Sequence, residues 1–332
     1  MTKRLTYIDI TRAILIAMVV FGHILNYANP QYDIIPYTLA QEFMNSFQMP
    51  AFFILSGMLT DGEKWRSRSV GAYFVHKTRT LLVPYLFFEC LAILYKHFVL
   101  RSVSLTEGLR LMLTMRCNVG ADWFLSAMFL ACALYYLYIH FPRKIAWGVG
   151  STVLLLGLQL FVSARGEQWR ILVFRGILGF VFMLAGNLLK KPLSDFRWWK
   201  IGGAFLLTAA ASAAFLKFSL DNSFYSGTLR SPLLYLISGI CGTYFVMGIA
   251  KWIPWKWPAQ IGENALTIMG THQLVLYTIH GRSSLLWVIG AFLLIAAVEA
   301  VLILVINRFC PALVGKRRRE TSDAGSKETN RA

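Results

Sequence analysis

Three ionisable side chains share one stripe of the first apolar segment. Asp9, Arg12 and His23 lie within residues 8–25, and Arg12 and His23 are eleven residues apart. At about 100° per helical residue, these two face the same way about 16 Å apart, with Asp9 one turn before Arg12. Ionisable groups inside a membrane span are costly and mark a functional interior, although polar contacts between helices are the structural alternative. Because histidine exchanges a proton near neutral pH, the stripe predicts proton-transfer chemistry within a membrane.

The composition indicates a membrane protein. Of the 332 residues, 57% are hydrophobic and 15% are charged, whereas about a quarter of a soluble domain is charged. The net charge of +17 arises from Lys and Arg in short loops between apolar runs, which is typical of membrane orientation, so no nucleic-acid binding is expected. The five cysteines lack the spacing of a zinc site, and we expect no metal.

Apolar segments of spanning length recur along the chain. We predict an all-α membrane protein, a bundle of about ten transmembrane helices. Residues 1–310 form one membrane domain, and the basic tail 311–332 is expected to be disordered, from Gly315 onward. The predicted spans lie near residues 10–28, 43–60, 80–99, 121–139, 145–163, 171–189, 199–218, 231–250, 260–279 and 284–307.

The distribution of Lys and Arg predicts the orientation. With the N-terminus inside, the inner loops carry more than twice as many of these residues as the outer loops, counting Lys3, Arg4, Arg143, Lys144 and the tail inside and Arg165 outside. Both termini are therefore predicted to be cytoplasmic. We expect a multi-pass protein of the bacterial cytoplasmic membrane.

This topology predicts that two histidines reach the same depth. His23 lies about 20 Å along the first span, and His272 lies about 18 Å from the start of the ninth span near Gln260. Both spans run outward, so both rings are expected in the outer half of a core roughly 30 Å thick. A lone buried histidine is commonly structural, but two at matched depth favour a functional role.

Polar and irregular features interrupt other spans. In the second span, Pro50 follows Gln48 and is expected to kink the helix, while Gly57 permits close helix approach. Lys77 and Arg79, expected in the inner loop before Pro84, are suited to bind phosphate; the alternative is that they only orient the protein.

An acid and an aromatic stand together at the outer start of the fourth span. Asp122 and Trp123 suit a sugar, which offers hydroxyl groups and an apolar face. Trp123 fits the interfacial aromatic belt equally well.

In this order, the motifs resemble the acyltransferase 3 family of integral membrane acyltransferases, which includes fucose 4-O-acetylase-like and O-antigen-acetylating proteins. The resemblance extends from about Tyr7 to Asn307. Five stretches carry it: Asp9-x-x-Arg12 with His23, then Pro50–Gly57, Lys77-x-Arg79 with Val83-Pro84-Tyr85, and, more weakly, Trp123-Phe124-Leu125 and Asn264-Ala265-Leu266 with His272.

The resemblance implies transfer of an acyl group, usually acetyl from acetyl-CoA, to a carbohydrate hydroxyl. Acyl-CoA is then a donor substrate, and no permanently bound cofactor is expected. The chemistry needs a base, stabilisation of an oxyanion and a way to bring both substrates together. Direct transfer and an acyl-histidine intermediate both remain open.

Roles can be assigned to the singled-out residues on this basis. We expect His23 to be the base, with Asp9 and Arg12 orienting one another and His272 contacting the acceptor or the thioester oxygen. Donor and acceptor contacts are expected from two further sets: Arg12, Lys77 and Arg79 for coenzyme A, and Gln48, Asp122, Trp123 and Asn264 for the sugar.

A transporter or flippase of a lipid-linked sugar or small anion is the main alternative. Buried ionisable groups and kinked spans suit transport too. The sequence shows no inverted repeat, however, and the matched histidines favour group transfer. An inactive scaffold or sensor is a third interpretation.

The predicted topology can be tested with fusions at the C-terminus. A cytoplasmic terminus should make an alkaline phosphatase fusion inactive and a fluorescent protein fusion bright. The reverse pair of results would contradict the orientation and, with it, the depth argument for the two histidines.

Overall fold

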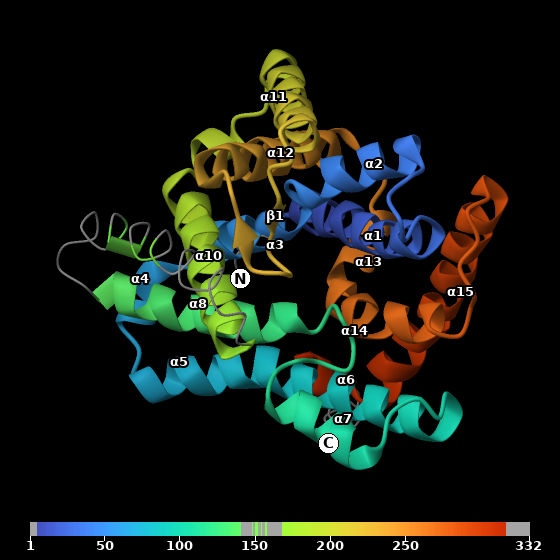
Figure 1. Cartoon of the computed structure of the whole chain (residues 1–332). Helices are drawn as coiled ribbons and strands as arrows, with labels where there is room; N and C mark the ends of the chain where they lie inside the picture. The colour runs from blue at the N-terminus through green and yellow to red at the C-terminus, as the bar shows by residue number, and fades with distance from the viewer. Residues whose placement is uncertain are drawn as a thin grey trace, which may run out of the picture.

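The structure, a computed structural model, describes residues 5–140, 148, 150, 151, 154, 157 and 168–316. Within these residues it is a bundle of helices with one two-stranded hairpin (Figure 1). The predicted span 145–163 lies mostly outside the described residues. Other residues used for the predicted orientation lie entirely outside the described residues: Lys3, Arg4, Arg143, Lys144, Arg165 and the tail beyond Lys316. The helices are α1 Thr6–Ala28, α2 Ile35–Asn45, α3 Gln48–Leu59, α4 Gly62–Arg66, α5 Val70–Lys77, α6 Val83–Leu94, α7 Leu105–Leu113, α8 Trp123–His140, α10 Gln168–Leu188, α11 Trp198–Lys217, α12 Pro232–Trp252, α13 Trp257–Glu263, α14 Ala265–Leu276 and α15 Leu285–Phe309; strands β1 Asn222–Ser223 and β2 Thr228–Leu229 pair antiparallel.

The prediction of an all-α membrane protein is confirmed. In the described part of the chain, seven helical segments are long and apolar enough to cross a membrane: Thr6–Ala28, Val70–Val99, Trp123–His140, Arg170–Leu188, Trp198–Lys217, Pro232–Trp252 and Leu285–Phe309. The predicted spans near 43–60 and 260–279 are instead broken helices. Each contains a twelve-residue helix, α3 or α14, preceded by the shorter helix α2 or α13.

The predicted kink at Pro50 is wrong. Pro50 is the third residue of α3, where an amide has no partner within the helix, so its missing N–H costs nothing there. The chain bends just before, between Asn45 and Gln48.

The inner loop predicted around Lys77 and Arg79 is helix instead. Residues Val70–Val99 run continuously through α5, a π-helical turn at Thr78–Leu82, α6 and a second π-helical turn at Tyr95–Val99. The first wide turn accommodates Pro84, which has no N–H to donate to the carbonyl of Thr80. Lys77 and Arg79 therefore lie on a continuous helix, which sets the directions in which their side chains leave the backbone.

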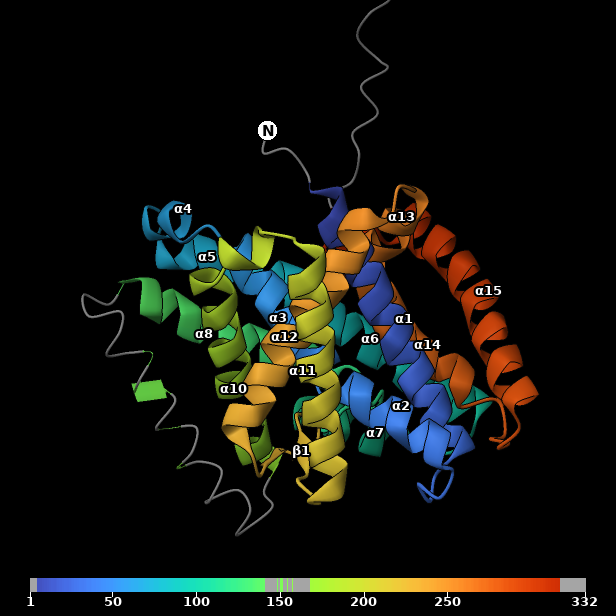
Figure 2. The same cartoon turned by 90° about the horizontal axis from the view of Figure 1, so that it is seen from above.

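The ends of the described chain lie at the same end of the bundle (Figure 2). A Cβ on Gly262 of α13 would lie 1.7 Å from the carbonyl oxygen of Asp9, so α13 packs directly on the start of α1. Lys316 donates to Oδ1 of Asn264, between α13 and α14. We call this the N-terminal end, and the opposite one, where α1 finishes and the β1–β2 turn lies, the hairpin end.

Small residues also permit a close crossing of α3 and α10. A Cβ on Gly57 of α3 would lie 1.9 Å from the carbonyl oxygen of Met183, and one on Gly186 of α10 would lie 2.1 Å from that of Ile54. The two backbones therefore touch without intervening side chains, as in small-residue packing within membranes. This confirms the predicted role of Gly57.

Replacing Gly57 with Ala should separate α3 from α10. Because the added methyl meets backbone rather than a flexible side chain, we expect a loss of about 1–3 kcal/mol. A thermal-unfolding measurement in detergent should show a lower melting temperature. The control is Gly290→Ala, whose methyl meets no atom within 4 Å; equal melting temperatures for the two variants would contradict the packing argument.

Candidate active site

The structure brings His23 of α1 and His272 of α14 together. Their ring centroids are 5.2 Å apart, and the ring planes are inclined by 40°. His272 is fully buried, whereas His23 is partly exposed to a cavity. The pairing follows from the packing of α13 on α1, because α14 comes directly after α13 in the chain and continues along α1.

The hydrogen bonds of His272 define its tautomer. Its Nδ1 lies 2.7 Å from the carbonyl oxygen of Ile268, one turn earlier. A carbonyl only accepts, so Nδ1 carries the hydrogen and Nε2 carries a lone pair. Nε2 has no hydrogen-bond partner among the described residues. This nitrogen is therefore a buried acceptor available to a proton donor.

A short relay orients His23. The amide N–H of Gly120 lies 3.5 Å from the Tyr277 hydroxyl, which donates to Oε1 of Gln273 at 3.0 Å. Gln273 thus turns its Nε2 toward His23, where it lies 3.1 and 3.0 Å from the two ring nitrogens. Since Nε2 only donates, it requires a ring nitrogen with a lone pair, which is the form that acts as a base.

A buried carboxyl fixes the other side of α14. Both carboxyl oxygens of Glu299 lie 2.8 Å from the hydroxyl of Thr271, the residue before His272. Glu299 is 3% exposed, although much of α15 faces outward at the edge of the bundle (Figure 1). This contact attaches the peripheral helix at the level of the histidines.

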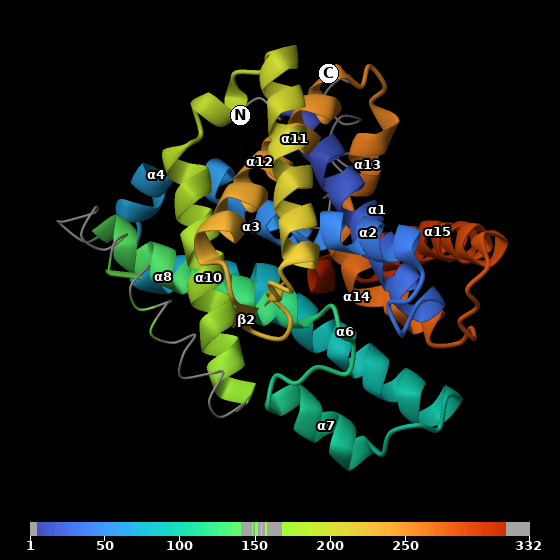
Figure 3. The same cartoon turned by 45° about the horizontal axis from the view of Figure 1, so that its top comes forward.

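An outer cavity of 760 Å³ opens at the hairpin end and reaches His23. Gln48, Trp123 and Gln273 line it, as do the loop before β1 and the hairpin. The hairpin lies beside α8 and α10 (Figure 3). Arg175 of α10 holds it there by donating to the carbonyl oxygens of Phe224, at 3.1 Å, and Tyr225.

Carboxylates contribute to the electrostatics of the outer cavity. Glu42 of α2 and Asp221 both line it. Burial, and then the nearby carboxylate of Asp221, raise the pKa of Glu42 above its usual range. Two carboxyl groups therefore line the outer cavity.

An inner cavity of 420 Å³ lies toward the N-terminal end, and Arg12 and Lys77 both line it. Arg12 forms an ion pair with Asp9 at 3.2 Å, and the ammonium of Lys77 lies 5.5 Å from the Tyr73 ring centroid. Arg79 is exposed and does not line this cavity.

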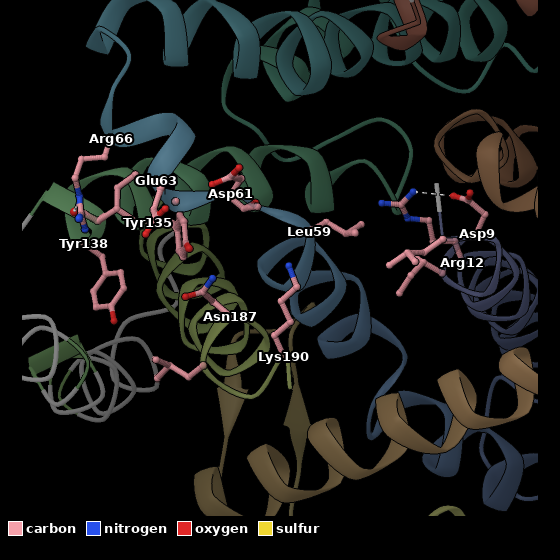
Figure 4. Close-up of a pocket in the computed structure, with 16 residues that line it drawn as sticks. Asp9, Arg12, Leu59, Asp61, Glu63, Arg66, Tyr135, Tyr138, Asn187 and Lys190 are labelled. Carbon is pink, nitrogen blue, oxygen red and sulfur yellow. Dashed lines mark hydrogen bonds and ion pairs between the residues drawn. The ribbon is translucent and has the colours of Figure 1, made fainter. Parts of the chain in front are cut away.

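A second inner cavity, of 960 Å³, shares Arg12 with the first. Figure 4 shows the Asp9–Arg12 pair at one side and Asp61, Glu63 and Arg66 at the other, with Lys190 between them. Both cations and carboxylates therefore line this opening. Together the two inner cavities form a wide, mixed-charge entrance beside Arg12.

The wall between the inner and outer cavities is thin. On α14, Met269 lines the inner cavity and Gln273 the outer one, with His272 between them in the sequence. On α3, Phe52 is inner and Met49 outer. Positions three or four residues apart on a helix are separated by about 5–6 Å. One helical turn therefore divides the cavities at the level of the histidines.

Two predicted acceptor residues do not line the outer cavity. Asp122 is fully buried next to the Glu89 carboxyl. Asn264 lies at the N-terminal end, where its Oδ1 accepts hydrogen bonds from Asn307, at 2.8 Å, and Lys316. The structure thus gathers Gln48 and Trp123 at the outer cavity, and separates Asn264 from them by the length of α14.

Sequence reasoning missed several of the polar residues around the histidines. Glu89 and Glu299 had a signal, since each is an acid inside an apolar span. Glu89 accepts from the backbone and side chain of Asn118 and so holds the loop that carries Gly120. Gln273 and Tyr277 had a weaker signal, their spacing of four residues on one helix face.

The fold and this site define a multi-span membrane protein with facing histidines between two cavities. A family model described as an acyltransferase domain matches residues 5–306. The chain belongs to this family, acyltransferase 3, and is a membrane-embedded acyltransferase. Comparison with curated proteins and with solved structures gives no match.

Proposed function

We propose that the protein transfers an acetyl group from cytoplasmic acetyl-CoA to a hydroxyl of a carbohydrate: a surface polysaccharide, an O-antigen or a lipid-linked sugar. The observation that carries the proposal is the pair of cavities at opposite ends of α1, divided by one helical turn that bears His272. A donor in one cavity and an acceptor in the other would meet at the histidines. The bacterial cytoplasmic membrane, with the N-terminal end inside, is the proposed location.

The inner cavity suits the donor. Coenzyme A is polyanionic, and the guanidinium of Arg12 and the ammonium of Lys77 offer charge-assisted hydrogen bonds to its phosphates. Beyond these cations the lining becomes apolar, with Phe52 and Met269, and suits the pantetheine arm. We assign donor binding to Arg12 and Lys77; Arg79, outside the lining, serves as the comparison.

The outer cavity suits the acceptor, with Gln48 and Trp123 as sugar contacts. His23 takes the proton of the acceptor hydroxyl as its oxygen attacks the thioester carbonyl; the coenzyme A thiolate leaves and receives that proton from His23. Gln273 keeps the His23 ring neutral by donating to its lone-pair nitrogen, and the acceptor hydroxyl must take the place of this amide when that nitrogen accepts the proton. The lone pair on Nε2 of His272 favours contact with an acceptor hydroxyl over contact with the thioester oxygen, because a lone pair cannot donate.

Membership of an acyltransferase family supports group transfer over the alternative of a transporter or flippase. The thin wall also suits a reaction in which only a small group crosses. The proposed transfer needs no further reactant, because the acceptor hydroxyl provides the attacking oxygen and its proton, and the coenzyme A thiolate is the leaving group.

Replacing His23 with Ala should reduce acetyl transfer by about a hundredfold or more, because the base is lost. His272→Ala should also reduce acetyl transfer, but by a smaller factor. Purified protein supplied with radiolabelled acetyl-CoA and membranes containing the glycan gives the rate, and immunoblotting gives the protein abundance.

The matched control for these variants is His280→Ala, which removes an exposed histidine beyond α14. It should keep the parent rate. Unchanged labelling in His23→Ala, at normal abundance, would refute the assignment of His23 as base.

Donor binding should depend on the residues that line the inner cavity. Arg12→Ala and Lys77→Ala should each weaken coenzyme A binding about ten- to a hundredfold, the value of a charge-assisted hydrogen bond. Arg12→Lys should also bind more weakly, since Lys lacks the bidentate fork. Titration calorimetry at several salt concentrations measures this, and higher salt should lower the affinity.

Arg79→Ala is the control for the titration. Its affinity should stay close to that of the parent protein, because Arg79 is exposed outside the cavity. If Arg79→Ala weakens binding while Arg12→Ala and Lys77→Ala do not, the inner cavity is not the donor site.

A further inference from the structure

The outer cavity is lined by acidic side chains and, among the described residues, by no lysine or arginine. Glu42 and Asp221 both line it. None of the described residues in its lining is Lys or Arg. The rest of its polar lining consists of the His23 imidazole, the Trp123 indole, and amide and hydroxyl groups, including those of Asn26, Asn45 and Ser223.

Two buried or partly buried cations near this cavity, Arg175 and Lys96, have partners elsewhere. Arg175 is 7% exposed, donates to the two carbonyl oxygens of the hairpin, and lies with its guanidinium carbon 4.8 Å from the Trp123 ring centroid. The ammonium of Lys96 donates to the carbonyl oxygen of Asn118 and lies 4.4 Å from the Tyr277 ring centroid. Neither residue lines the cavity, so neither is placed to pair with an anion inside it.

An unsatisfied acceptor also belongs to the cavity wall. Gln48 is 7% exposed and lines the cavity. Its Nε2 donates to Oδ1 of Asn45 at 2.9 Å, which fixes the amide, while its Oε1 has no hydrogen-bond partner among the described residues. A buried acceptor without a donor is costly, so this oxygen calls for an O–H or N–H group from a ligand.

We infer that the outer cavity selects sugar units that offer hydrogen-bond donors and carry no negative charge, and that it excludes uronic acids, sialic acids and phosphorylated sugars. Hydroxyl or ammonium groups would donate to Glu42, Asp221 and Oε1 of Gln48. An anionic sugar would instead meet like charges without a compensating cation, which strongly disfavours binding. The identity of the ligand as a sugar rests on the proposed function.

The charge selection can be tested without any acyl transfer. In Ser223→Cys, the new thiol lies in the cavity beside Asp221. It should react with a cationic trimethylammonium methanethiosulfonate reagent faster than with the anionic sulfonate reagent, by on the order of tenfold when normalised to a small free thiol. Parent protein gives the background of the native cysteines, and Asn45→Cys, a second lining position, replaces Ser223→Cys if that variant does not fold.

Two further variants decide the outcome. Thr278→Cys, exposed at the same end but outside the cavity lining, should show little preference. Adding Glu42→Gln and Asp221→Asn to Ser223→Cys should bring its ratio down to that of Thr278→Cys. Equal ratios for Ser223→Cys and Thr278→Cys, or a ratio unaffected by the two neutralising changes, would overturn the inference.

The modified sugar itself gives the second test. Acetyl esters present in the glycan of parent cells and absent after gene deletion can be mapped by mass spectrometry. Esters on neutral or amino sugars support the inference, and esters on a uronic acid, a sialic acid or a phosphorylated sugar overturn it. Loss of no ester at all would refute the proposed function, while the thiol reactions would still decide whether the cavity selects by charge.

Discussion

The site depends on the contact between α13 and α1. Gly262 has no side chain, so the α13 backbone touches the carbonyl of Asp9 and α14 continues along α1. His272 consequently meets His23, with their ring centroids 5.2 Å apart. Any larger residue at position 262 would push the two backbones apart, and the separation would extend along α14 to the histidines. A single backbone contact at the N-terminal end thus controls the geometry in the middle of the bundle.

Two buried charged side chains of this bundle, Glu89 and Arg175, anchor irregular backbone. Unpaired backbone groups are costly within a membrane, so irregular segments need partners from side chains. Glu89 accepts from the amides of Asn118 and Val119, and Arg175 donates to the carbonyl groups of the hairpin. These anchors shape the outer cavity, because they fix the loop carrying Gly120 and the hairpin that line it. Much of the charge in this bundle therefore maintains structure around the histidines.

Hydrophobic period and depth along the chain predicted the helical bundle and the matched depth of His23 and His272, because both follow from regular helix geometry. The positions at which helices begin and end were less predictable. Pro50 was expected to kink a helix that in fact begins at Gln48, and Lys77 was expected in a loop that is helix. Asn264 was grouped with the acceptor contacts, but it lies near the far end of α14. Three-dimensional partners, such as Gln273 for His23, depend on how helices rotate against each other, which a single sequence does not specify.

The thin wall between the cavities is consistent with the group transfer that we propose. A transporter must move a whole solute past its barrier, so both sides of the barrier have to open in turn. Here Met269 and Gln273 face different cavities from adjacent turns of α14, and His272 lies between them. If donor and acceptor each stay in their own cavity, as we propose, only the acyl group has to pass this level. The wall can then remain closed, and its histidines can serve as both barrier and reaction centre.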